Sequence, residues 1–341
     1  MTKRVTSFDV AKHAGVSRSV VSAVLNGTAG IGVSEETRRN VLAAIKELNY
    51  QVDANARGMR TGRSRCLAAY DNFASKFFLP ILQGLKNVCT TEGYYILLFD
   101  SGDAEKDRNA LIDMYLQRRI DGIITKDSTS FIDAEWAYKV RNCGVPYISV
   151  EGYPENNQIP SILMDYSGSI VLALDYLQDR GAPRPVYIEM YTGPKYHPNW
   201  GDRQRRISYE NWMSIRGFRP EVYAVQDKEW EDCAAWWIEW LRSQPLPVTV
   251  LSNWSRGAVY LYKAAYQLGL KIGQDVFVMA SDNTGQVNEL LVPSLSSVEV
   301  PYTQMGELAA VRLLEYVEGT RSMSDTSSIM VTPKIFHRES T

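Results

Sequence analysis

Most of the chain alternates short apolar runs with amphipathic stretches of helical spacing. The apolar runs are LAAY, YYILLF, DGIIT, VPYISV, SILMD, VYIEM, VTVLS and VFVMAS, which begin at residues 67, 94, 121, 145, 161, 186, 248 and 276. Short apolar runs separated by helices are typical of parallel sheets with crossover helices. We therefore expect an α/β body from residue 66 onward, with ligands bound at the carboxyl ends of its strands.

The first 50 residues show a different pattern, which predicts three short helices. Thr6 or Ser7 caps the first helix, Ser17 caps the second, and Ser34 caps the third. At 100° per residue, one side of the second helix is apolar, whereas the other carries Arg18, Ser19, Ser22 and Ala23. Two helices joined at Gly15, the second with a short polar face, indicate a helix-turn-helix that fits the major groove of DNA.

Charge separates the head from the body, although the formal net charge is only −2. Residues 1–65 carry 11 Lys and Arg against 5 Asp and Glu, whereas the remaining residues carry 26 against 34. A basic head on an acidic body favours a polyanion as the partner of the head. The segment from residue 51 to 65 holds four arginines and few apolar residues, so it is predicted to be a linker that need not fold alone.

Several classes of protein lose support. The four cysteines lack metal-ligand spacing, so we expect neither a metal site nor a disulfide framework. No GxGxxG follows the first strand and no P-loop occurs, and no cofactor is expected. We expect a cytoplasmic protein without a membrane partner, because the sequence has no signal-peptide pattern and no apolar run long enough to span a bilayer.

Five short motifs follow one another in the head. They are D-V-A-x-x-A-G-V-S from Asp9, V-S-x-V-L-N-G from Val21, V-S-x-x-T-R from Val33, L-N-Y from Leu48 and R-T-G-R-S from Arg60. Looser matches continue in the body, with G-Y-Y-I-L-L from Gly93, R-R-I-D-G-I-I from Arg118, G-V-P from Gly144 and P-S-L-S-S-V-E-V-P from Pro293. In these motifs the chain resembles the LacI/GalR family of bacterial transcriptional regulators.

The resemblance implies a fold and a set of DNA contacts. The implied fold is an N-terminal three-helix helix-turn-helix head and a hinge helix, followed by a periplasmic-binding-protein-like body of two doubly wound parallel-sheet lobes. The implied boundaries are 1–51 for the head, 52–65 for the hinge, 66–163 with 299–325 for the N-terminal lobe, and 164–298 with 326–341 for the C-terminal lobe. The implied DNA-binding residues are Thr6, Ser17, Arg18, Ser19, Ser22, Asn26, Asn55, Arg57 and Met59.

Two departures from the family pattern affect these DNA contacts. The family usually has an arginine where this chain has Ala23, so we expect Arg18 to take over part of the guanine contact. The leucine that wedges into the minor groove is replaced by Met59, which is also an apolar wedge.

The body resembles the family at its effector positions. Arg205 matches the arginine of R-x-x-G-F, and Asp282 matches the first acid of G-F-D-D. Charged groups hydrogen-bond vicinal hydroxyls, and an aromatic ring packs on the apolar face of a pyranose. Trp254 replaces the acid of the family's A-N-D, which favours a ligand with a larger stacking surface. The implied effector residues are Phe78, Lys126, Glu151, Arg205, Trp230, Asn253, Trp254 and Asp282. Ion pairing for the charged residues and core packing for the tryptophans remain as alternatives.

These observations predict a homodimeric repressor that reads a pseudo-palindromic operator and responds to a saccharide. One alternative keeps DNA binding but has a purine-like effector or none. Another is a cytosolic sugar-binding or sugar-processing protein whose N-terminal helices pack on the body. We expect no enzymatic activity, because no nucleophile and base pair is recognisable among residues that include only three histidines, His13, His197 and His337.

Overall fold

The structure is a computed structural model that describes residues 5–26, 32–51, 58, 61–73, 75–100, 104–156, 158–283 and 285–341, without the side chains of Asn26 and residues 104–107. Two compact units, Met1–Ser64 and Arg65–Thr341, divide the chain. In the part of the chain that is described, no helix is long and apolar enough to cross a bilayer.

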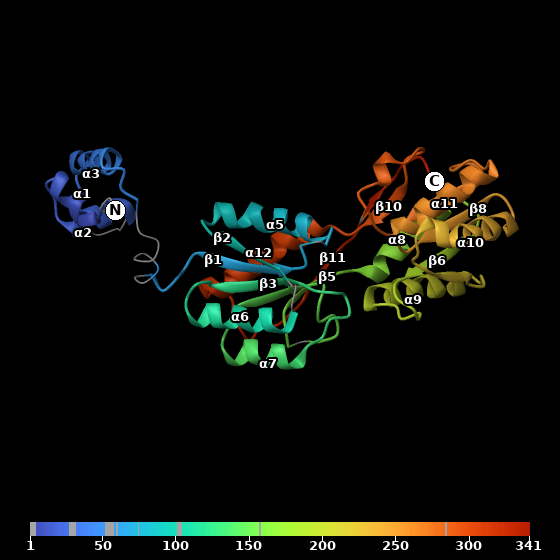
Figure 1. The fold of residues 1–341 in the computed structure, drawn as a ribbon, viewed down its shortest axis with the longest axis horizontal. Helices are drawn as coiled ribbons and strands as arrows, with labels where there is room; N and C mark the ends of the chain where they lie inside the picture. Colours follow the sequence, from blue (N-terminus) through green and yellow to red (C-terminus); the bar gives the residue numbers. More distant parts are fainter. Residues whose placement is uncertain are drawn as a thin grey trace. The chain divides into compact units, whose positions relative to one another are not determined.

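The N-terminal unit contains the three predicted helices, α1 (Ser7–His13), α2 (Arg18–Asn26) and α3 (Glu35–Glu47) (Figure 1). Thr6, rather than Ser7, caps α1, because its hydroxyl accepts from the Asp9 backbone N–H while Asp9 bonds back to the Thr6 backbone. The helices close around a small core of Val10, Ala11, Val21, Val24, Val41 and Ala44. The predicted helix-turn-helix head is confirmed.

The N-terminal lobe of the body is a six-stranded parallel sheet in the order β11-β5-β4-β3-β1-β2. Its strands are β1 (Cys66–Asp71), β2 (Tyr95–Asp100), β3 (Gly122–Lys126), β4 (Tyr147–Val150), β5 (Ser161–Met164) and β11 (Ile329–Val331). Helices α5 (Phe78–Thr91) and α12 (Tyr302–Glu318) cover one face, and α6 (Ala104–Leu116) and α7 (Ala134–Asn142) cover the other (Figure 1).

The C-terminal lobe repeats this plan with the strand order β12-β10-β9-β8-β6-β7, in which only β12 is antiparallel to its neighbour. Its strands are β6 (Pro185–Tyr191), β7 (Val222–Gln226), β8 (Val248–Ser252), β9 (Val276–Ala280), β10 (Ser296–Glu299) and β12 (Lys334–Phe336). Helices α8 (Tyr166–Asp179) and α9 (Trp200–Ile215) lie on one face, α10 (Trp230–Ser243) and α11 (Ser255–Leu268) lie on the other, and a short 3₁₀ helix spans Asn288–Leu290 (Figure 1).

The chain passes between the two lobes three times, after β5, β10 and β11. The sequence places the last crossing after residue 325, but Ile329 still pairs with Ile162 in the N-terminal sheet, so the crossing lies between Val331 and Lys334. The sequence does not reveal β11, because a strand of three residues is too short to produce an apolar pattern.

Both sheets are doubly wound, and this topology positions a ligand site. The strand order reverses between β1 and β3 in one lobe and between β6 and β8 in the other. Crevices outside the carboxyl ends of strands at such reversals are where α/β sheets bind ligands. In this protein those ends carry Asp71, Lys126 and Glu151 in one lobe and Asn253 and Asp282 in the other.

Candidate functional site

A cavity of about 710 Å³ lies between the two lobes, and residues of both lobes line it. Its volume falls within the range of small-molecule sites. Six of the eight predicted effector residues line it, namely Lys126, Glu151, Arg205, Trp230, Trp254 and Asp282. The fold therefore brings six predicted residues that are distant along the chain to the wall of one cavity.

Two predicted effector residues do not line the cavity. Phe78 is buried in the N-terminal lobe core and stacks on Phe73, and its neighbour Phe77 faces the cavity instead. Asn253 is fully buried and exchanges two hydrogen bonds with the Met190 backbone, accepting from N at 2.8 Å and donating to O at 2.9 Å. The residue that faces the cavity thus precedes the predicted Phe78 by one position, and the Asn253 side chain bonds the β6 backbone.

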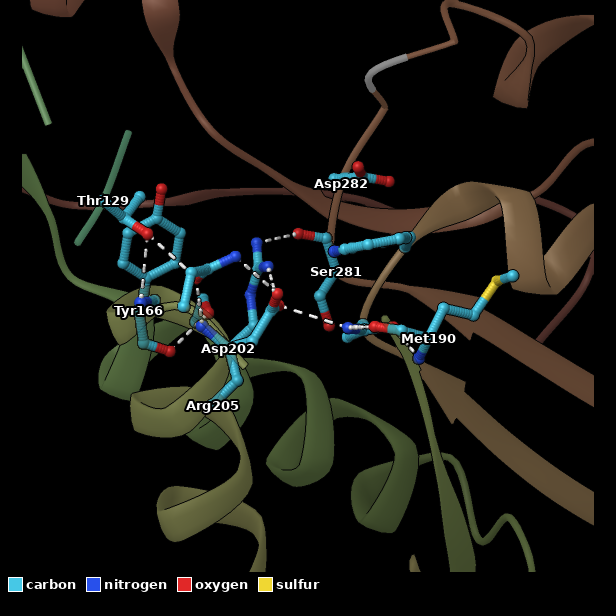
Figure 2. Close-up of polar contacts among 12 residues, drawn as sticks. Thr129, Tyr166, Met190, Asp202, Arg205, Ser281 and Asp282 are labelled. Atoms are coloured by element: carbon cyan, nitrogen blue, oxygen red, sulfur yellow. Dashed lines mark hydrogen bonds and ion pairs between the residues drawn. The ribbon is translucent and has the colours of Figure 1, made fainter. Parts of the chain in front are cut away.

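Arg205 stands at the centre of a buried polar network in the C-terminal lobe (Figure 2). Its Nη1 donates to Asp202 Oδ1 at 3.1 Å, and its Nη2 donates to the Ser281 carbonyl at 2.8 Å. Asp202 also accepts from Asn253 Nδ2 at 3.2 Å and from Asn199 Nδ2 at 2.8 Å. The network therefore fixes the arginine between α9 and the ends of β8 and β9.

The electrostatics of this network keep Arg205 charged. Burial lowers the pKa of Arg205, but the Asp202 carboxylate and nearby tyrosines more than offset burial, so the pKa of Arg205 is raised overall. The guanidinium lies over the Tyr166 ring, 4.7 Å from its centroid. Its Nε is buried and finds no hydrogen-bond partner among the described residues.

Asp282 lies beside the start of α11. Its Oδ1 accepts from the Ser255 backbone N–H at 2.5 Å, where the partial positive charge of a helix N-terminus favours a carboxylate. Trp254 precedes Ser255 and is only partly buried, with its side chain on the cavity wall. The beginning of α11 thus places a carboxylate and an indole at the same cavity.

Glu151 forms the corresponding cluster in the N-terminal lobe. Its Oε2 accepts from Lys126 Nζ at 2.8 Å, and its Oε1 accepts from the Tyr166 hydroxyl and, at 3.5 Å, from that of Tyr302. Glu151 is the family-derived candidate for a hydroxyl ligand, but both of its oxygens already have partners inside the protein. Its φ of 71° lies in the left-handed region, a strained conformation of the kind that concentrates at functional sites.

Four aromatic residues of the cavity wall, Phe77, Tyr166, Tyr260 and Tyr302, escaped the sequence prediction. Phe77 is the N-cap of α5, and Tyr302 is the first residue of the neighbouring helix α12. Their ring centroids lie 5.1 Å apart, and Lys126 Nζ lies 5.3 Å from the Phe77 centroid. Tyr166 follows β5 and is the first residue of α8. Phe77 lies next to the predicted Phe78, and Tyr166 follows the expected strand β5, so a boundary position was the available signal for these two. Tyr302 follows β10, which the apolar pattern does not reveal, and Tyr260 lies inside α11.

The start of α9 connects the lobes beside the cavity. The Thr129 hydroxyl donates to Asn199 Oδ1 at 2.8 Å, and the Trp200 backbone N–H donates to the Ser130 hydroxyl at 2.6 Å. The Trp200 indole donates to Glu155 at 3.0 Å. Because Asn199 also bonds Asp202, these contacts link the Arg205 network to the N-terminal lobe (Figure 2).

Asp71 ends β1 close to Lys126 and Glu151 and is 8% exposed. One carboxylate oxygen accepts from the Asn72 N–H at 2.7 Å, and Oδ2 has no hydrogen-bond partner among the described residues. Burial raises the pKa of Asp71 from 3.8 to about 6. Since the pKa in the folded state exceeds the unfolded value, the stability that this group contributes is present below pH 4 and is lost as the pH rises through 6.

Replacing Asp71 by asparagine should therefore raise the midpoint of thermal unfolding at pH 7.5 by about 2–4 °C, the shift that roughly 1 kcal/mol produces in a domain of this size. At pH 4.5 the midpoint should change little, because the native carboxyl is then largely protonated. Scanning calorimetry at both pH values measures the effect. An unfolding midpoint that falls equally at both pH values would show that the Asp71 side chain makes interactions in the folded state that stabilise it.

The described part of the head presents a small polar surface. Arg18 and Ser19 are exposed at the start of α2, and Ser17 caps this helix, its hydroxyl accepting from the Val20 N–H at 3.4 Å. Ala23 stands where the family has an arginine and is buried, not on the polar face. The side chain of Asn26, and all of Asn55, Arg57 and Met59, lie outside the described residues.

Histidine does not contribute to the part of the cavity wall that the structure describes. None of the three histidines, all of them described, lines it, and His337 instead packs on Tyr176 with ring centroids 4.4 Å apart. Over the described ranges, no cluster of three or more His, Cys, Asp or Glu has a geometry that could hold a metal ion.

Comparison with known proteins gives matches in both units. The model of bacterial regulatory proteins of the lacI family matches residues 8–53, and the model of the periplasmic binding protein-like domain matches residues 174–341. Catabolite control protein A of Priestia megaterium is 25% identical over 340 residues, which cover 99% of each chain. The transcriptional repressor PurR of Erwinia tasmaniensis is 28% identical over 347 residues, which cover 98% of this chain and 96% of the relative.

Solved structures share the fold along nearly the whole chain. The lac repressor dimer bound to operator and the anti-inducer ONPF has a TM-score of 0.76 at 21% identity and covers 99% of each chain. The complex of the regulator CelR with cellobiose has a TM-score of 0.64 at 23% identity and covers 99% of this chain and all of the other. These likenesses confirm the predicted arrangement of a helix-turn-helix head and a two-lobed α/β body.

Proposed function

We propose that this chain, which belongs to the LacI family of bacterial regulatory proteins, is a dimeric repressor. Its affinity for operator DNA is controlled by a saccharide bound between its lobes. The proposal adds three features to family membership: the dimer, repression and the class of effector. Two heads on a symmetric dimer would read the two halves of a pseudo-palindrome.

The side chains that line the cavity support a saccharide as the effector. Aromatic rings from both lobes face it, Phe77 and Tyr302 on one side and Trp230 and Trp254 on the other. Beside them stand the guanidinium of Arg205 and the carboxylate of Asp282. A saccharide offers apolar C–H faces to the rings and hydroxyls to the charged groups, so it uses both kinds of surface.

A purine-like effector is the second candidate. Its support is the 28% identity to PurR repressors along nearly the whole chain, together with the aromatic side chains that would stack on a planar base. The CelR complex, whose ligand is cellobiose, supports the saccharide. Both candidates keep the same cavity and the same DNA-binding head.

A ligand panel separates the two candidates. Thermal unfolding of the full chain would be followed with mono- and disaccharides and, in parallel, with purine bases and nucleosides. A ligand at 100 times its Kd stabilises the folded state by about 2.7 kcal/mol. Stabilisation by saccharides alone supports the proposal, and stabilisation by purines alone contradicts it. Footprinting on upstream DNA with and without the binding ligand then tests operator control.

Arg18→Ala should weaken binding to the operator by about 1–3 kcal/mol and relax the preference at one base position, because Arg18 leads the exposed polar face of α2 and Ala23 cannot replace its contact. Competition binding to operators substituted at each base pair measures both effects. Arg39→Ala, an exposed arginine on α3, is the matched control. An equal loss of affinity for every sequence would reduce Arg18 to a phosphate contact.

Trp254→Asp should weaken binding of the preferred saccharide about tenfold and shift the preference toward smaller, more hydroxylated sugars, since a carboxylate offers acceptors but no stacking face. Calorimetric titration with a disaccharide and its constituent monosaccharide measures the shift. Trp236→Asp, at a tryptophan that does not line the cavity, is the control. Unchanged affinity would show that Trp254 only packs.

A further inference from the structure

The cavity extends beyond its polar centre along helix α11. Ser255, Val259 and Lys263 lie on its wall, so it follows this helix for two turns. At a rise of 1.5 Å per residue, the distance from Ser255 to Lys263 is about 12 Å. This length exceeds one pyranose ring, and the outer part of the cavity therefore has room for a second unit of the effector.

The outer part has a rigid aromatic wall. The rings of Trp230 and Tyr260 lie 5.5 Å apart, and Trp237 supports Tyr260 from the lobe core at 5.6 Å. The Tyr260 hydroxyl donates to the Lys228 carbonyl at 2.7 Å, which holds the ring in place. A fixed aromatic surface of this kind suits the apolar face of a sugar ring.

Most charges around the outer part are already matched. Arg256 pairs with Asp227 at 2.6 Å and with Glu229 at 3.0 Å. Glu231 is exposed in the first turn of α10, where the helix dipole offsets a negative charge. At the inner end, Asp282 accepts the Ser255 N–H at the start of α11.

Lys263 is different, because no carboxylate of the described residues pairs with it. Its ammonium lies 4.9 Å from the centroid of the Trp230 ring, and its side chain lines the cavity. Lys76 brings a second cation without an ion pair in the described structure, this time from the N-terminal lobe. Each lobe thus brings to the cavity wall one lysine without an ion pair among the described residues, and Glu231 is a carboxylate in the same position.

We propose that the outer part of the cavity is a second subsite for an acidic sugar unit, whose ring packs against Trp230 and whose carboxylate pairs with Lys263. The effector is then an acidic oligosaccharide, one that contains uronate units. This inference rests on the proposed saccharide effector and names its chemical class. A carboxylate fits better than a phosphate, because phosphate sites usually gather several donors or an arginine fork, whereas Lys263 offers one compact charge.

The test compares each acid with its own uncharged form. Dimers of galacturonate, glucuronate and mannuronate would be titrated calorimetrically into the full chain, each beside its methyl ester, with glucose 6-phosphate and cellobiose in parallel. We expect at least one uronate dimer to bind tenfold or more tightly than its ester. Lys263→Gln should remove that difference, Lys263→Arg should keep part of it, and Lys271→Gln, an exposed lysine away from the cavity, should leave it unchanged.

Each other outcome overturns the inference in a recognisable way. Equal binding of acids and esters, or tightest binding of cellobiose, rejects the acidic subsite while leaving the saccharide effector standing. Tightest binding of glucose 6-phosphate assigns the charge to a phosphate instead. If no sugar binds and purines do, the saccharide effector fails together with the subsite.

Discussion

Replacing Arg205 by methionine should lower the free energy of unfolding of the body by about 3–5 kcal/mol, the cost of leaving a buried charge without its partner. Asp202 is 2% exposed, and its carboxylate would keep only the side-chain amide donors of Asn199 and Asn253. The Ser281 carbonyl would also lose its donor. Urea unfolding of the full chain at pH 7, followed by tryptophan fluorescence, measures the loss.

Two further variants separate the charge from the volume of the side chain. Arg203→Met lies on the same helix at an exposed position and should change stability by less than about 0.5 kcal/mol. The double variant Asp202→Leu with Arg205→Met should recover much of the loss, because it removes both charges. It should still bind effector poorly, since the charged group that Arg205 brings to the cavity wall is gone. A single Arg205→Met variant as stable as Arg203→Met would contradict the network.

Gly84→Ala should destabilise the N-terminal lobe by about 3 kcal/mol, at the upper end of typical overpacking costs. A methyl group there would lie 2.0 Å from the Thr303 carbonyl oxygen and 2.8 Å from the Glu307 nitrogen, and backbone atoms cannot rotate away. The better helix propensity of alanine gains only about 1 kcal/mol, so the steric cost decides the sign.

The same substitution should weaken effector binding. Helices α5 and α12 begin at the aromatic pair of Phe77 and Tyr302, and separating the helices moves these rings. Unfolding midpoints and saccharide titrations would be compared with Lys86→Ala, an exposed position on α5 that should change neither. An unaltered midpoint for Gly84→Ala would show that the two helices do not approach so closely.

The sequence predicts eight of the twelve strands found among the described residues, because each of the eight is an apolar run flanked by helical patterns. The apolar pattern misses β7, β10, β11 and β12. Strand β7 lies at a sheet edge with one fully buried residue, and β11 and β12 have three residues each. Such strands carry too few buried positions to produce a periodic signal.

The candidate site shows the same division. Motif matches bring Arg205, Trp230 and Asp282 to the cavity wall, although 77 positions separate the first from the last. The sequence pattern does not determine which residue at the start of a helix faces the cavity. It selects Phe78, but Phe77 lines the cavity and Phe78 lies in the core. Sequence patterning also does not reveal that the Asn253 side-chain amide bonds the Met190 backbone and so joins the end of β8 to β6.

The sequence by itself determines the local elements, since caps and apolar spacing act within a few residues, and it determines the family through ordered motifs. Only the tertiary structure decides which polar groups remain for a ligand. Glu151 accepts hydrogen bonds from hydroxyls 15 and 151 positions away, and Lys263 has no ion pair among the described residues, whereas Arg256 on the same helix has two. Hydrogen bonds and ion pairs depend on distances of a few ångström between segments far apart in the chain, which spacing along the sequence does not encode.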